Sequence, residues 1–141
     1  MPLRKMLTRI AISSLLPVIL LFFGACNDDQ RTDILGNWKM VVVLQDGNDV
    51  SAEHNPNNDR FIELGSDGTF QSKGGEFGKN SGKYLWDGID STLVLDSDAG
   101  EDDDSRWKVR FSGDTMKWTG TGTVWAERFE IWHVPTPKDN D

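Results

Sequence analysis

The sequence predicts an all-β protein, an antiparallel up-and-down β-barrel of about eight strands that follows a signal peptide. Two observations lead to this fold class. After residue 33, short segments of alternating apolar and polar residues recur at steady spacing, separated by turns rich in Gly, Asp and Asn. Consecutive segments joined by short turns favour a meander of hairpins, which removes its exposed edges by closing into a barrel.

The N-terminal segment has the features of an export signal. Three basic residues precede the apolar run Ile10–Phe23, which is too short and wrongly flanked for a stable membrane span. We therefore expect residues 1–25 to be removed. Phe23-Gly24-Ala25-Cys26 resembles the lipobox of bacterial lipoproteins, which implies that Cys26 is acylated and anchors the protein to the outer membrane. The alternative is an ordinary signal peptide that leaves a free thiol at Cys26.

Charge and cysteine content restrict the partners and the means of stabilisation. The net charge of the chain is −8, and loss of the three basic residues in the signal makes it −11. Such an acidic chain is not suited to nucleic acid. Cys26 is the only cysteine, so no disulfide forms within the chain and the fold depends on its core. Residues 26–33 are expected to be the acylated cysteine and a flexible tether.

The first strand is expected over residues 36–45. Gly36 lets the chain turn beside the large indole that follows it. Alternate residues of a strand share a face. The residues expected on the apolar face are Trp38, Met40, Val42 and Leu44. Residues 46–59 then form a long, turn-rich loop that could fold over the barrel mouth as a lid.

Seven further strands complete the predicted barrel, and the mature chain contains no convincing helix. Asp67-Gly68 is a strong signal for a hairpin turn. Pro135 and Pro137 end the last strand because proline cannot donate a ladder hydrogen bond. The barrel domain is expected to span residues 34–135, followed by a disordered tail over residues 136–141. The seven strands are expected over residues 60–64, 69–73, 82–87, 91–96, 106–111, 115–119 and 123–134.

Three motifs occur in order along this predicted barrel. They are Leu35-Gly36-Asn37-Trp38, the stretch Phe61–Phe70 with its Asp-Gly-Thr turn, and Gly82-Lys83-Tyr84 leading to Leu93-Val94-Leu95. With them, residues 34–134 resemble the lipocalin-like domain family of Bacteroidetes lipoproteins. The resemblance implies a calycin-type β-barrel in which Trp38 closes the floor, with Arg128 as the basic side chain beside its ring.

The tryptophans are the best indication of function. There are six of them, all expected in strands, with Trp107, Trp118 and Trp125 facing inward and Trp132 outward. An aromatic wall could bind a small hydrophobic or amphipathic ligand. Alternatively, the rings fill a narrow barrel, and its loops contact another envelope protein. The candidate ligand-binding residues are Trp38, Met40, Trp107, Val109, Phe111, Met116, Trp118 and Phe129.

No residue pattern indicates an enzyme or a cofactor. His54 and His133 are expected on the surface, because neither has a second ligand at a metal-binding spacing. No strained nucleophile motif occurs. The only acids well inside predicted strands are Glu63, Glu127 and Glu130, and their convergence in a pocket would indicate carboxylate catalysis.

The acidic run over residues 96–104 resembles a calcium-binding loop in composition only. It lacks the oxygen ligand before glycine and the terminal glutamate at the required offset. We therefore expect no metal site in the chain. A weak calcium site in this run remains the alternative to a solvated charge run that protects a strand edge.

Overall fold

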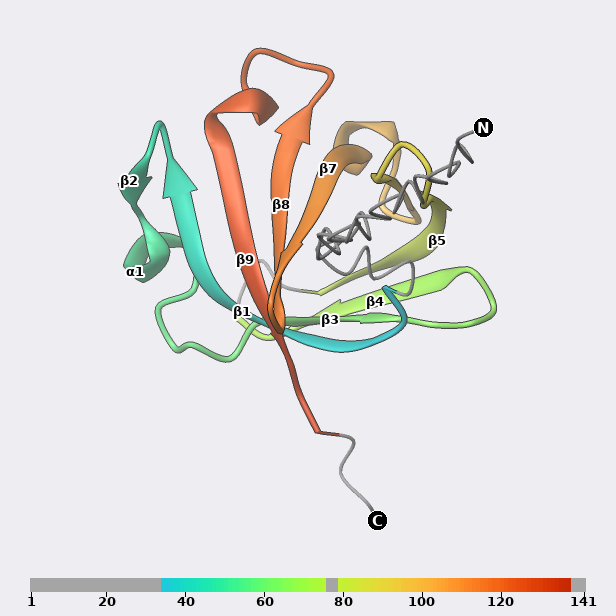
Figure 1. Ribbon diagram of the computed structural model, residues 1–141, viewed down its shortest axis with the longest axis horizontal. Coiled ribbons are helices and arrows are strands. Elements are labelled where there is room, and N and C mark those ends of the chain that lie inside the picture. Colours follow the sequence, from blue (N-terminus) through green and yellow to red (C-terminus); the bar gives the residue numbers. More distant parts are fainter. Residues whose placement is uncertain (1–33, 76–78, 138–141) are drawn as a thin grey trace, which may run out of the picture.

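The computed structural model describes residues 34–75 and 79–137. In this part of the chain, eight antiparallel strands form a closed up-and-down barrel, because β1 pairs with both β3 and β9 (Figure 1). The predicted fold class is therefore confirmed. The barrel strands are β1 (Gly36–Gln45), β3 (Phe61–Leu64), β4 (Thr69–Lys73), β5 (Asn80–Asp87), β6 (Thr92–Ser97), β7 (Ser105–Ser112), β8 (Thr115–Thr121) and β9 (Phe129–Pro135).

The expected signal peptide, the acylation site at Cys26 and the tether all lie outside the described residues.

The two ends of the barrel differ. One end, which we call the mouth, carries the β6–β7 connection and the β8–β9 loop, seen at the top of Figure 1. The other, which we call the closed end, carries the turns between β5 and β6 and between β7 and β8. The chain also leaves β9 there, where Thr136, expected in the tail, still donates to the carbonyl of Asn37.

The long loop after β1 is more ordered than the sequence suggests. It contains β2 (Asn48–Asp49), which pairs with the end of β1, and the one-turn helix α1 (Ser51–His54). The expectation of no helix was wrong here because a single turn is too short to show helical periodicity. Local polar bonds form it instead: Asp49 accepts from the amide of Ser51, whose hydroxyl accepts from the amide of Val43.

The first strand follows the predicted alternation only as far as Met40. The register against β9 shifts between Met40 and Val42, so that Val43 is buried while Val42 and Leu44 are not. The prediction for Val42 and Leu44 was therefore wrong. A β-bulge inserts one extra residue and reverses the side-chain parity beyond it. The side chain of Asn55 stabilises this site by donating to the carbonyl of Met40 at 3.0 Å.

The last strand is shorter than predicted. Residues 123–128 form a loop containing the 3-10 helix η2 (Ala126–Arg128), and Trp125 is 66% exposed instead of inward. The loop packs closely over β8 at Gly120, where a Cβ atom would lie 2.1 Å from the carbonyl oxygen of Ala126. The hydroxyl of Thr123 accepts from the amide of Ala126 and starts this turn. Trp132 lies under the ammonium of Lys117, outside the lumen as expected.

Apolar side chains fill the closed end. The indole Nε1 of Trp38 donates to the carbonyl of Ile34 at 2.8 Å, and both residues are buried. The predicted partnership of Trp38 with Arg128 is wrong, because Arg128 lies at the mouth and pairs with Asp46. The main core cluster consists of Ile34, Trp38, Ile62, Leu64, Phe70, Leu93, Leu95, Val109, Met116 and Trp118.

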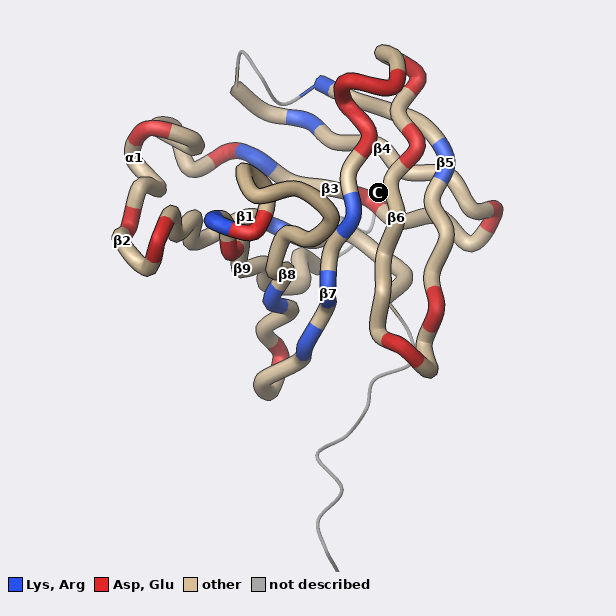
Figure 2. Tube along the Cα trace, turned by 90° about the horizontal axis from the view of Figure 1, so that it is seen from above, with Lys and Arg blue, Asp and Glu red and all other residues tan. Residues whose placement is uncertain are grey.

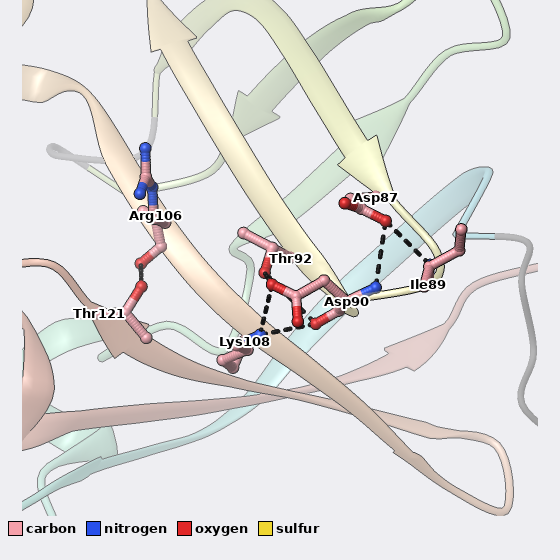
Figure 3. Close-up of polar contacts among 7 residues, drawn as sticks. All are labelled: Asp87, Ile89, Asp90, Thr92, Arg106, Lys108 and Thr121. Carbon is pink, nitrogen blue, oxygen red and sulfur yellow. Dashed lines mark hydrogen bonds and ion pairs between the residues drawn. The ribbon is translucent and has the colours of Figure 1, made fainter.

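At the surface of the closed end, exposed polar contacts stabilise the β5–β6 turn and link it to β7. In the β5–β6 turn, Asp87 accepts from two backbone amides, and Asp90 pairs with Lys108 of β7 at 3.0 Å (Figure 3). Within the described residues, every strand and core residue of the barrel lies between residues 34 and 135. We therefore expect the chain from residue 27 onward to fold without the signal segment.

Candidate ligand cavity

The mouth opens into a cavity of about 660 Å³, which we call the outer cavity. One part of its wall is apolar and comes from β1, β6, β7, β9 and the β8–β9 loop. Its rim carries charge from η1 (Glu101–Asp103) and from Arg106 at the start of β7. Figure 2 shows acidic residues gathered in the β6–β7 connection and basic residues along β7. The apolar lining residues are Met40, Val43, Val94, Trp107, Trp125, Ala126, Phe129 and Ile131.

A narrower space of about 170 Å³, which we call the inner cavity, adjoins the outer one. The two cavities share lining residues, including Met40, Arg60 and Trp107. The inner cavity is also bounded by Trp118 of β8 and His133 of β9, whose rings lie 4.5 Å apart between centroids. The barrel therefore has internal space between its mouth and its filled closed end.

The structure divides the candidate ligand-binding residues into two groups. Met40, Trp107 and Phe129 line the outer cavity, and Trp118 lines the inner one together with Met40 and Trp107. The other four belong to the apolar packing of the closed end and line neither cavity. These four are Trp38, Val109, Phe111 and Met116.

His133 corrects a sequence-based expectation. It was expected on the surface but is only 2% exposed, inside the barrel. Its position in β9 explains this, because Phe129, Ile131 and His133 share one strand face and line the cavities. Burial, followed by the nearby positive charge of Arg60, lowers the pKa of His133 to about 3. The imidazole is therefore neutral near pH 7.

Arg60 is a cavity residue that sequence reasoning missed. It precedes β3, and its backbone is held on both sides: its amide donates to Asn55 and its carbonyl accepts from the amide of Met40. Its guanidinium donates to the carbonyl of His54 at 3.0 Å. Burial lowers the pKa of Arg60, with the charge of Asp59 acting in the opposite direction. Arg60 is the first residue of the strand expected over residues 60–64, where a charged side chain does not by itself indicate an inward orientation.

The remaining candidate acids and His54 do not converge in one cavity. Glu63 and Glu127 are exposed, and Glu130 accepts from the indole nitrogen of Trp132. None of the three lines the inner or outer cavity. His54, expected on the surface, is half-buried at the mouth, where its ring meets the ring of Phe129 at 5.6 Å.

In the acidic run at the β6–β7 connection, individual carboxylates accept hydrogen bonds from different groups. Asp104 accepts from the amide of Ser97 at 2.8 Å, and Asp98 accepts from the hydroxyl of Ser81 at 2.9 Å. Among the described residues, no group of three or more His, Cys, Asp or Glu side chains is arranged to hold a metal ion. Residues 34–75 and 79–137 also include no helix with the length and hydropathy needed to cross a membrane.

Fold and site together define the molecule as a closed antiparallel β-barrel with a partly apolar internal cavity. Its structure is similar to the crystal structure of a DUF4847 family protein from Bacteroides vulgatus, with a TM-score of 0.53 and 15% sequence identity. The match covers 74% of this chain and 94% of that protein. At this identity the likeness establishes the fold alone. No family model and no curated protein matches the sequence.

Proposed function

We propose that the barrel binds a small hydrophobic or amphipathic ligand inside its lumen, without enzymatic activity. The observation that carries this proposal is the outer cavity of about 660 Å³ with its wall of Met40, Val43, Trp107, Phe129 and Ile131. Its volume lies within the range of about 300–1,000 Å³ that is typical of small-molecule sites. Apolar burial would drive binding, since the wall offers several large side chains at one place.

We further propose that the protein is a lipid-anchored lipoprotein of the outer membrane, attached through Cys26. The lipobox-like sequence supports the anchor, and the motif order along residues 34–134 supports the kinship with lipocalin-like domains. The described chain begins at the closed end, where Ile34 is buried beside Trp38. In an anchored protein, this arrangement would direct the mouth away from the point of attachment.

A second candidate function is an interaction module that contacts another envelope protein through its loops. The observation that favours it is the β8–β9 loop, where Val124 is 84% exposed and Trp125 is 66% exposed. Neighbouring exposed apolar side chains at a loop tip are typical of contact sites. In this case a small ligand would not be required.

Binding can be tested by titrating the chain from residue 27 with a hydrophobic dye and with 1-decanol. A saturable change in tryptophan emission at micromolar ligand supports an open lumen, because Trp107 lines both cavities. The variant Phe129→Asp places a charge in the outer wall and should abolish binding. The exposed substitution Ile89→Asp is the matched control, since Ile89 is 99% exposed at the closed end. Absence of any saturable change would refute lumenal binding and favour the interaction module.

A further inference from the structure

The junction of the two cavities contains the positive charge of Arg60, which forms no ion pair among the described residues, although the charge of Asp59 acts on it. Arg60 lines both cavities, and within the described residues its one side-chain hydrogen bond joins Nη1 to the carbonyl of His54. In the described part of the chain, the two ion pairs are Lys108–Asp90 and Arg128–Asp46, so neither involves Arg60. A guanidinium carries five N–H donors, and most of those of Arg60 are left for other partners.

Two buried polar atoms of the same region also have no partner. They are the indole Nε1 of Trp118 and the Nδ1 of His133, and their residues are 3% and 2% exposed. Both residues line the inner cavity, and their rings are in contact. A buried donor without an acceptor is unfavourable, and most such groups in folded proteins are paired. The wall of the inner cavity therefore includes a buried indole and a buried imidazole, and Arg60 lines the same cavity.

The distribution of negative charge around the lumen is uneven. Among the described residues, no Asp or Glu lines the inner cavity. The acids of the outer cavity, Glu101, Asp102 and Asp104, are exposed at the rim, where Arg106 offsets part of their charge. Rim charges are screened by solvent and salt, whereas a charge inside the barrel is screened much less. The electrostatic preference of the lumen is therefore set by Arg60.

We infer that the inner cavity binds the carboxylate of an amphipathic ligand, with Arg60 as the anion-binding residue. This inference rests on the proposed function and specifies its ligand class. A planar carboxylate matches the fork of N–H groups that a guanidinium presents. The apolar tail of the ligand would extend from the junction into the outer cavity, along Met40, Phe129 and Ile131.

The test compares ligands that share a tail and differ in head group. Binding of decanoate, 1-decanol and decyltrimethylammonium is measured by calorimetry at pH 7.5 on the chain from residue 27. We expect decanoate to bind at least about ten-fold more tightly than 1-decanol, as a charge-assisted hydrogen bond would provide. Decyltrimethylammonium should bind more weakly than either.

Substitutions test which residues cause the preference for decanoate over 1-decanol. Arg60→Met should remove the preference for decanoate and leave the affinity for 1-decanol within about two-fold. Arg60→Gln, which keeps an N–H group for the carbonyl of His54, replaces it if Arg60→Met does not fold. Arg106→Met is the matched control, because it removes an exposed rim arginine and should retain the preference.

The outcomes separate the two proposals. Equal affinities for decanoate and 1-decanol in the unaltered protein, or a preference that survives Arg60→Met or Arg60→Gln, would overturn the carboxylate site and leave lumenal binding intact. If neither ligand binds, both the carboxylate site and the proposed function are refuted. A preference lost equally in Arg106→Met would place the anion at the rim and also overturn the inference.

Discussion

The buried His133 should make the protein sensitive to mild acid. Its pKa in the folded state is about 3 because burial disfavours the imidazolium and Arg60 repels it. The ordinary pKa of histidine in an unfolded chain is about 6.5. Since the folded state binds fewer protons, stability is fully present above pH 6.5 and declines as the pH falls toward 3.

The magnitude follows from the difference between the two pKa values. Between pH 7.5 and 5.5 the unfolded chain gains nearly one proton at this histidine, while the folded protein gains almost none. The free energy of unfolding should therefore fall by about 1.4 kcal/mol over this interval. Carboxyl groups with lowered pKa, such as Asp46 and Asp67, titrate below the interval and do not contribute.

The assay is urea unfolding followed by tryptophan fluorescence at pH 7.5, 6.5 and 5.5. His133→Gln removes the titrating group and should abolish most of the loss between pH 7.5 and 5.5. The amide in a buried site will lower stability at every pH, so the comparison concerns the pH dependence alone. His54→Gln, at the half-buried histidine of the mouth, is the matched control. Parallel pH dependence in the unaltered protein and His133→Gln would refute the reasoning.

Three further predictions concern the stability of the barrel. Asn55→Ala leaves the carbonyl of Met40 at the β-bulge without its side-chain donor and should lower the free energy of unfolding by about 1–3 kcal/mol in urea titrations. Gly120→Ala places a Cβ against the carbonyl of Ala126 and should cost about 1–3 kcal/mol, measured as a lower thermal midpoint. Lys108→Met removes an exposed ion pair and should leave the urea midpoint nearly unchanged.

Each of these three stability predictions has a control variant or an outcome that would contradict it. Asn57→Ala alters an exposed asparagine of the same loop and should be neutral. Gly88→Ala meets its nearest atom at 3.4 Å, so it tests whether any added methyl group destabilises the barrel. A large loss of stability in Lys108→Met would contradict the small contribution assigned to exposed ion pairs.

Local sequence was sufficient for the strands and the tight turns. The β3–β4 hairpin follows from Asp67-Gly68, because Gly68 adopts a positive φ of 81° and Asp67 accepts from the amide of Thr69. The alternation over residues 106–111 places Arg106 and Arg110 on one face of β7, and both are exposed. These features depend on neighbours in the chain, so residue type and spacing predict them.

Prediction failed where a distant segment overrides the local pattern. In β1, alternation alone cannot reveal the bulge after Met40, which is held by Asn55 across 15 residues of sequence. At the last strand, Trp125 continues an apolar alternation, yet it belongs to a loop folded over Gly120. Both errors arise because a contact outside the strand determines which residues enter the ladder.

The sequence alone therefore determined that the chain is acidic and forms an all-β barrel, a meander of strands joined by turns rich in glycine and aspartate. Strand and turn propensities act over a few residues, so residue type and spacing are sufficient for these features. Only the tertiary structure decided what lies inside. Closing the barrel brings Arg60, Trp118 and His133 from separate segments to one cavity, and it buries a histidine that local pattern assigned to the surface. Burial and charge depend on all surrounding strands at once, so no single segment encodes them.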